Sequence, residues 1–259
     1  ERGDYLLCSE KVNLGLGYGY SGGFTKYCRI PGEILAIHKR AIWEIPEGLE
    51  YEEAAVMDPI CNAYKAIAQR SGLLPGENVV IFGTGPLGLF SVQIAKIMGA
   101  LNIVVVGLEE DVKVRFGVAR QLGATEVVNG SAEDVVKRCQ EICGGSDSIG
   151  LVVDCAGANI CLKQAIEMVR CNGEIVRVGM GFKPVGFSIN DISMKAVSII
   201  GHMAYDATSW RNSLQLLAAG RIQVKPMITH RLGLSRWEEG FEAMADKEAI
   251  KVILTYDFD

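Results

Sequence analysis

The sequence lacks the features that mark several whole classes of protein. Lysine and arginine are spread along the chain rather than clustered, and the formal net charge is −5, which disfavours nucleic acid as a partner. No apolar run reaches the roughly 18–20 residues that span a bilayer. The opening residues do not resemble a signal peptide, because no charged segment leads into an apolar one. We therefore expect neither a nucleic-acid-binding protein nor a membrane protein.

Familiar metal-binding patterns are absent too. The 8 cysteines include no CxxC pair, and none of the 3 histidines stands in an HExxH motif: His38, His202 and His230. In a chain without a secretion signal, scattered cysteines favour reduced thiols. The sequence therefore predicts a cytoplasmic protein.

What the chain does have is a change of pattern near residue 79. Its 259 residues suffice for one large domain or two ordinary ones. Residues 1–60 are rich in glycine and turn signals, with short apolar pieces such as Ile34–Ile37 and Ala41–Ile45, and this predicts irregular β structure. After residue 205 the expected order is a helix over 207–219, a short strand at 226–229, a helix over 235–245 and a strand at Lys251–Thr255.

Between these two parts, short β-branched runs alternate with amphipathic stretches. The predicted strands are Val79–Phe82, Ile103–Val106, Glu126–Val128, Gly150–Asp154, Glu174–Val178 and Val197–Ile200. The predicted helices lie at 86–98, 111–122, 132–143, 159–170 and 188–195. Strands that alternate with helices predict a parallel sheet covered on both faces, and six strands in this order match a doubly wound α/β fold.

A glycine-rich loop follows the first predicted strand and opens a helix; its residues are Gly83, Thr84, Gly85, Pro86, Leu87 and Gly88. In such a loop the first glycine permits a tight turn, the second lets the backbone approach a pyrophosphate, and the third lets the helix pack closely on the strand. The helix N-terminus offers free N–H groups to the phosphates. The pattern predicts a dinucleotide site, with a plain structural turn as the alternative.

The residues after the second predicted strand bear on the choice of dinucleotide. Glu109 and Glu110 fall about 20 residues beyond the glycines, where an acid binds the adenosine ribose. A carboxylate about 4 Å from a 2′-phosphate would repel it by roughly 4 kcal/mol, about a thousandfold in affinity, so NAD is favoured over NADP. Both glutamates could instead be solvated residues opening the next helix. Lys113 and Arg115 could also serve a phosphate.

An ordered series of segments gives the chain a family resemblance: Gly22–Tyr27, Pro46–Leu49, Glu52–Ala55, Asp58–Ala63, Asp154–Gly157, Gly173–Gly179 and Ile250–Thr255. Together with the glycine loop they resemble the medium-chain, zinc-type alcohol dehydrogenase superfamily over essentially the whole chain. The step Asp58-Pro59 followed by Asn62-Ala63 is similar to that of the sorbitol and L-threonine dehydrogenase branch.

The resemblance implies a fold and a reaction. The fold is α/β: a Rossmann doubly wound parallel sheet over 63–205, between two pieces, 1–62 and 206–259, of a partial GroES-like β-rich catalytic domain. In the family a catalytic zinc polarises the alcohol and hydride passes to NAD+. The implied substrate is a small alcohol, a polyol or a threonine-like amino alcohol. The implied assembly is a homodimer or homotetramer joined near Ser198–Ala204.

The resemblance also assigns individual residues. Asp58 stands where the family has its third zinc ligand or a nearby carboxylate; alternatively it caps a helix from Pro59 to about Gln69. Cys8 is similar to the last cysteine of the structural zinc lobe. Lys251 matches a basic position near the pyrophosphate, although a solvated lysine is an equal alternative. Ala156 and Gly179 correspond to coenzyme-binding positions at the ends of two strands.

Two departures limit what the resemblance implies. The family's first two catalytic zinc ligands would lie upstream of residue 1, so zinc is expected in a longer parent protein and the catalytic residues stay unassigned. Gly107 or Leu108 stands where NAD-preferring members commonly have aspartate. Two other functions therefore remain open: a zinc-free, NADPH-linked quinone or enoyl reductase, and a chain that binds NAD without catalysis.

Overall fold

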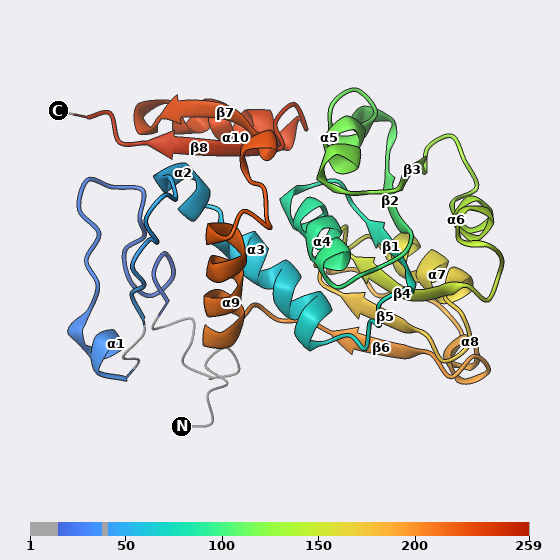
Figure 1. Cartoon of the computed structure of the whole chain (residues 1–259). Helices are drawn as coiled ribbons and strands as arrows, with labels where there is room; N and C mark the ends of the chain where they lie inside the picture. Colours follow the sequence, from blue (N-terminus) through green and yellow to red (C-terminus); the bar gives the residue numbers. More distant parts are fainter. Residues whose placement is uncertain (1–14, 38–40, 259) are drawn as a thin grey trace.

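The computed structural model describes residues 15–37 and 41–258. Its centre is a parallel sheet of six strands in the order β3-β2-β1-β4-β5-β6 (Figure 1). The strands are β1 (Asn78–Phe82), β2 (Ile103–Gly107), β3 (Glu126–Asn129), β4 (Ile149–Asp154), β5 (Glu174–Arg177) and β6 (Ser198–Gly201). This order is that of a doubly wound Rossmann sheet, so the predicted fold class is confirmed.

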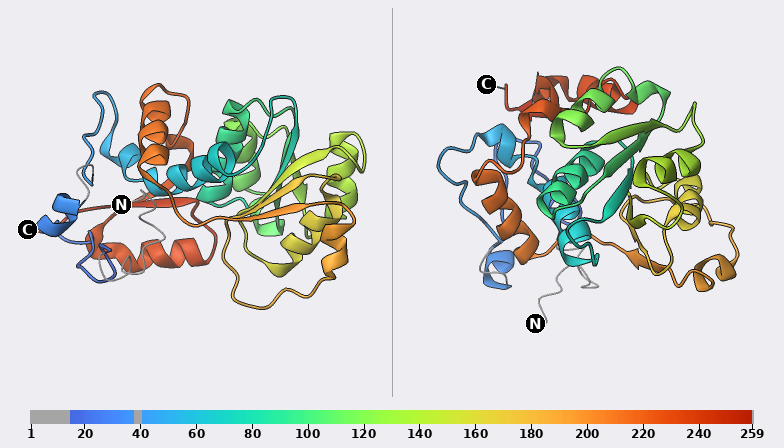
Figure 2. Two further views of the ribbon diagram at one scale, coloured as in Figure 1. Left: turned by 90° about the horizontal axis from the view of Figure 1, so that it is seen from below. Right: turned by 45° about the vertical axis from the view of Figure 1, so that its right-hand side comes forward.

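Helices cover both faces of the sheet, as the alternating pattern predicts (Figures 1 and 2). Side chains alternate along each strand, so Val79 and Ile81 of β1 enter one hydrophobic core while Val80 and Phe82 enter the other. The first core contains residues of α3 (Met57–Tyr64), α4 (Pro86–Ile97), α5 (Arg115–Leu122) and α9 (Ala207–Ala218). The second contains residues of α6 (Val135–Cys143) and α7 (Asn159–Met168), and the partly buried Ile192 of α8 (Ile189–Ser193) packs against it.

The residues after α9 form a smaller unit beside the main sheet. Strands β7 (Ile228–Gly233) and β8 (Lys251–Thr255) pair in parallel, and α10 (Trp237–Ala245) packs on them (Figure 1). The strand expected at 226–229 starts only at Ile228, because Lys225–Met227 is a 3-10 turn with Pro226 in it. Proline cannot donate a hydrogen bond to a β ladder, which delays the strand.

The irregular β structure predicted for residues 1–60 is wrong for the described part of that segment. Ile34–Ile37 lies in helix α1 (Gly32–Ile37), and 41–45 belongs to no helix or strand. A short helix, α2 (Tyr51–Ala54), and one isolated bridge, between Leu16 and Tyr20, are the regular features nearby. Apolar runs of four or five residues are too short for periodicity to separate helix from strand.

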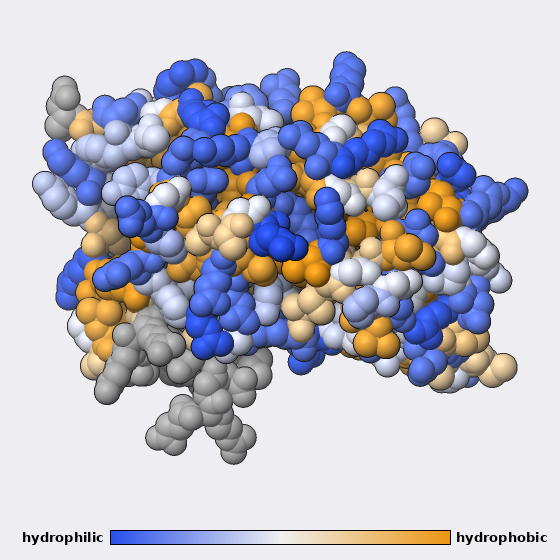
Figure 3. Space-filling view, in the orientation of Figure 1, coloured by the Kyte–Doolittle hydropathy of each residue, from blue (hydrophilic) through white to orange (hydrophobic). Residues whose placement is uncertain are grey.

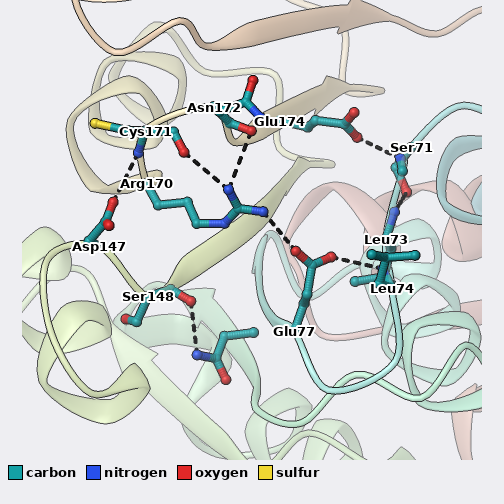
Figure 4. A network of polar contacts seen from close by, with 12 residues as sticks. Ser71, Leu73, Leu74, Glu77, Asp147, Ser148, Arg170, Cys171, Asn172 and Glu174 are labelled. Atoms are coloured by element: carbon teal, nitrogen blue, oxygen red, sulfur yellow. Dashed lines mark hydrogen bonds and ion pairs between the residues drawn. The ribbon is translucent and has the colours of Figure 1, made fainter.

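A polar network fastens the amino ends of the central strands (Figure 4). Arg170 donates from Nη2 to Glu77 Oε1 at 2.8 Å and from Nη1 to the carbonyl of Cys171 at 3.1 Å. Glu174, the first residue of β5, accepts the Gly72 N–H at 2.6 Å. These bonds tie together the loops at the amino edge of the sheet. The cleft described below lies at the opposite, carboxyl edge.

The molecular surface in the view of Figure 3 mixes hydrophilic side chains with scattered hydrophobic patches. Within residues 15–37 and 41–258, no helix has both the length and the apolar character needed to cross a membrane.

Candidate functional site

A cleft of about 480 Å³ lies at the carboxyl edge of the sheet. It is bounded by the loop Gly83–Gly85 after β1, the end of β2, and the residues Cys155 and Ala156 after β4. Strands β1 and β4 are neighbours, although the chain runs outward to β3 between them. The cleft therefore sits at the topological switch point, where doubly wound sheets bind their ligands.

The three glycines of the loop occupy three different environments. Gly83 has φ +104°, and a Cβ there would lie 3.3 Å from the Ala156 nitrogen. A Cβ at Gly85 would meet no atom within 4 Å, so the space in front of it is open. A Cβ at Gly88 would lie 1.9 Å from the Gly83 carbonyl oxygen. The loop therefore combines a tight turn, an open approach and close helix-to-strand contact, which are the three features that a pyrophosphate cradle requires.

Helix α4 points its N-terminus at this open space. Gly85 is its N-cap residue and Pro86 occupies the first turn, so no side chain caps the helix. The first N–H groups of α4 are consequently free to bind an anion, and the helix dipole favours negative charge there. Pro86, Leu87 and Gly88 shape this N-terminus but do not line the cleft, whereas Thr84 does.

The end of β4 is fixed by a buried acid that the sequence analysis did not single out. Asp154 is fully buried; its Oδ1 accepts the N–H groups of Ala156 at 3.0 Å and Gly157 at 2.9 Å, while its Oδ2 pairs with Arg177. Ala156 is thereby held at the cleft wall. Gly179 packs closely against the backbone of Ala156 and Gly157, since a Cβ at Gly179 would lie 2.3 Å from the Gly157 nitrogen.

Cys155 also lines the cleft. Burial raises the pKa of its thiol to about 12, so the sulfur stays protonated and is not a nucleophile.

The end of β2 differs from what the sequence analysis expects. Glu109 accepts the Asn129 amide at 2.6 Å, and Glu110 pairs with Lys247; neither glutamate lines the cleft. The acid that does line it is Asp111, which is 5 % exposed. Arg115 lines it as well, and its Nη2 donates to the carbonyl of Ala249 at 2.7 Å.

Comparison with known proteins decides which family has this arrangement. The family model described as zinc-binding dehydrogenase matches residues 86–219. A zinc-type alcohol dehydrogenase-like protein of Escherichia coli K12, YdjL, is 72% identical over 260 residues, which cover 100% of this chain and 72% of that protein. The chain belongs to the zinc-binding, medium-chain alcohol dehydrogenase family. The family resemblance inferred from the sequence is thus confirmed.

Two more members of this dehydrogenase family extend the comparison. Sorbitol dehydrogenase of Halalkalibacterium halodurans is 31% identical over 98% of this chain and 70% of its own length. The alcohol dehydrogenase TADH from Thermus sp. ATN1 superposes with a TM-score of 0.86 at 28% identity, covering 99% of this chain and 72% of that one. The family comprises oxidoreductases that act on CH–OH groups, and it implies zinc together with a nicotinamide coenzyme.

The described residues of this dehydrogenase do not assemble a zinc site. Within 15–37 and 41–258, no three histidine, cysteine, aspartate or glutamate side chains come together to hold a metal. Asp58 is exposed in the first turn of α3, where the Asn62 amide donates to its carbonyl at 3.0 Å. Cys8 lies outside the described residues. The described residues alone therefore do not fit a catalytic zinc ion.

Asp58 does not cap the helix, contrary to the alternative role expected for it from the sequence. Helix α3 begins at Met57 with Val56 as its N-cap, so Asp58 lies inside the first turn and does not cap the helix. The helix continues beyond Tyr64 as a π-helix, η2 (Lys65–Gln69). An acid in the first turn still interacts favourably with the helix dipole.

Lys251 lies away from the coenzyme cleft. At the start of β8 it lines a separate hollow of about 420 Å³ that Phe24 and Phe241 also border. Burial lowers the pKa of Lys251, and the negative charge of Asp58 opposes that effect. The structure therefore brings Lys251 into the surroundings of Asp58, not of the glycine loop.

A half-buried histidine near α3 makes the stability of the protein depend on pH. His202 Nε2 lies 3.1 Å from Asn62 Oδ1, and burial, with Lys65 and Arg70 nearby, lowers the pKa of His202 to about 4. In the unfolded chain the pKa of His202 returns to about 6.5, so the ring binds a proton more tightly in the unfolded chain than in the folded one. The contribution of the neutral ring to stability is complete above pH 6.5 and is lost as the pH falls toward about 4.

We expect this loss to show in the thermal midpoint. Between pH 6.5 and 4 the midpoint of the wild type should fall more steeply than that of His202→Gln, which keeps a donor for Asn62 but cannot titrate. Comparing the two proteins removes the contribution of the carboxylates, which they share. Parallel curves for the two proteins over this range would contradict the assignment.

Proposed function

We propose that this chain binds NAD in the cleft beside Gly85 and serves the transfer of hydride between NAD and a small alcohol or polyol. The observation that carries the proposal is the uncapped N-terminus of α4 behind an open space at Gly85, in a member of a dehydrogenase family. When bound, the nicotinamide supplies the hydride acceptor at its C4 atom. A threonine-like amino alcohol is included among the substrates, since the resemblance reaches that branch.

The described residues have distinct roles in this proposal. The first N–H groups of α4 bind the pyrophosphate, and Gly85 lets the backbone approach it. Ala156, held by Asp154, forms the wall after β4 against which the nicotinamide half packs. The apolar side chains of Val106 and Ile160 exclude water from parts of the same cleft.

We further propose that two copies associate along β6, as the resemblance implies for Ser198–Ala204. β6 is an outermost strand of the sheet, and Ile199 and Met203 near it are 37% and 51% exposed. An open strand edge with exposed apolar side chains is able to pair with a second copy. The cytoplasm is the proposed location, which the free thiols of the described cysteines support.

One set of assays separates the proposed function from its alternatives. Purified protein is titrated with NADH by fluorescence and assayed with NAD+ against sorbitol, other polyols, simple secondary alcohols and L-threonine, with bound zinc measured in the same preparation. We expect saturable NADH binding and oxidation of at least one of these alcohols. NADPH-linked reduction of a quinone or enone would favour the reductase alternative. Binding of NADH with no turnover would favour a coenzyme-binding chain.

A further inference from the structure

One arginine joins the ends of two neighbouring strands at the carboxyl edge of the sheet. Arg177, the last residue of β5, pairs through Nη1 with Oδ2 of Asp154, the last residue of β4. Its Nη2 donates to the carbonyl of Gly157 at 2.6 Å. The guanidinium thus uses one nitrogen for a carboxylate and the other for a backbone carbonyl of the turn that follows β4. The planar, forked shape of arginine makes this double contact possible.

The turn after β4 is packed tightly against the loop after β5. Gly157 has φ +77°, a left-handed conformation that favours glycine, and a Cβ there would lie 2.8 Å from the Met180 nitrogen. A Cβ at Gly181 would lie 3.0 Å from Nη2 of Arg177. The guanidinium therefore fills the space between the two loops, and the position of each loop depends on it.

The turn that Arg177 holds also forms a wall of the coenzyme cleft. Ala156 and Ala158 line the cleft, and Gly157 stands between them, whereas Arg177 does not line it. Asp154 is fully buried, so desolvation offsets much of its attraction to Arg177, and a buried ion pair of this kind is a weak source of net stability. The pair is better explained by the shape that it imposes on the wall.

A second arginine provides an internal reference for this arrangement (Figure 4). Arg170 likewise binds one carboxylate and one backbone carbonyl: its Nη2 donates to Glu77 Oε1 at 2.8 Å and its Nη1 to the Cys171 carbonyl at 3.1 Å. These contacts lie at the amino edge of the sheet, and none of the three residues lines the cleft. The two arginines therefore make the same kind of contact at opposite edges of one sheet.

We propose that Arg177 is a positioning residue for the coenzyme. Without touching the ligand, it holds the Gly157 carbonyl so that Ala156 and Ala158 form the cleft wall before the coenzyme arrives. A wall that is already formed raises affinity, because none of the binding energy is used to order the turn. The inference rests on the proposed function in that a dinucleotide occupies the cleft.

The test measures the dissociation constant of NADH by fluorescence titration for the wild type, Arg177→Lys and a matched control, Arg170→Lys. Lysine keeps the positive charge but offers one nitrogen in place of the two that each arginine uses. We expect Arg177→Lys to bind NADH about tenfold more weakly, the lower end of what one hydrogen bond to a charged group contributes. Arg170→Lys should keep the wild-type affinity. The unfolding midpoint of each protein, measured alongside, shows that it is folded during the titration.

The outcomes are distinguishable. Failure of the wild type to bind NADH overturns the proposed function and this inference with it. With wild-type binding intact, unaltered NADH affinity in Arg177→Lys overturns this inference alone, since a purely structural role would lower only the midpoint. An equal loss of affinity in both lysine variants also overturns it, because a general loosening of the sheet would then explain the loss.

Asp154→Asn decides the question if Arg177→Lys does not fold. The amide oxygen of asparagine still accepts the N–H groups of Ala156 and Gly157, but its nitrogen cannot pair with Arg177. The arginine then loses the contact that directs its second nitrogen to the Gly157 carbonyl. We expect a similar loss of NADH affinity in this variant, and wild-type affinity there would contradict the proposal.

Discussion

Replacing Gly85 with valine is expected to weaken NADH binding by about 100-fold or more while leaving the unfolding midpoint almost unchanged. Gly85 has φ −72° and ψ 177°, an extended conformation open to any residue, and a Cβ there meets no protein atom within 4 Å. The added side chain therefore costs the fold little but fills the space that the pyrophosphate needs. Losing one or two hydrogen bonds from N–H groups to a charged phosphate, at roughly 1.5–3 kcal/mol each, gives this magnitude.

A matched control for this variant is Gly186→Val. Gly186 also has no atom within 4 Å of a built Cβ and no positive φ, but it borders a different hollow, near Lys163 and Lys195. We expect unaltered NADH affinity in that control, measured by the same fluorescence titration. Wild-type affinity in Gly85→Val would show that the pyrophosphate does not approach this loop.

The sequence predicted the central sheet well because its signals are local and repeated. β1 is buried along its whole length, and such a strand is a continuous apolar run that ends at a glycine turn. The start of α6 shows the limit of this reasoning: the helix expected from 132 begins at Val135, because the side chain of Asp134 accepts the Lys137 N–H and caps it.

The candidate site was predictable only in part, for a physical reason. The glycine loop is contiguous, so its spacing is visible in the sequence. The acid that lines the cleft, Asp111, depends on an irregular turn that bends it back to Gly107, and this contact has no signature in the spacing of residues. The same holds for the pair between Asp154, which ends β4, and Arg177, which ends the neighbouring strand β5. Contacts between strands and the course of an irregular turn need coordinates, whereas a contiguous loop motif does not.

Gly88→Ala is expected to lower the free energy of unfolding by about 3 kcal/mol or more, at or above the upper end of the usual cost of overpacking. A Cβ at Gly88 would lie 1.9 Å from the carbonyl oxygen and 2.9 Å from the carbonyl carbon of Gly83. Both atoms belong to the backbone of the turn after β1, so neither can move without opening the loop or shifting α4 off the sheet. Helix propensity alone would predict the opposite sign, a gain of about 1 kcal/mol for alanine.

Gly117→Ala separates these two effects. Gly117 lies in α5, has no positive φ, and a Cβ there meets no atom within 4 Å, so only helix propensity acts and the protein should gain up to about 1 kcal/mol. Urea unfolding of both variants beside the wild type measures the difference. Equal stability of Gly88→Ala and the wild type would mean that α4 does not pack on the Gly83 turn. In that case the helix N-terminus would not be held at the cleft, and the pyrophosphate cradle would lose its support.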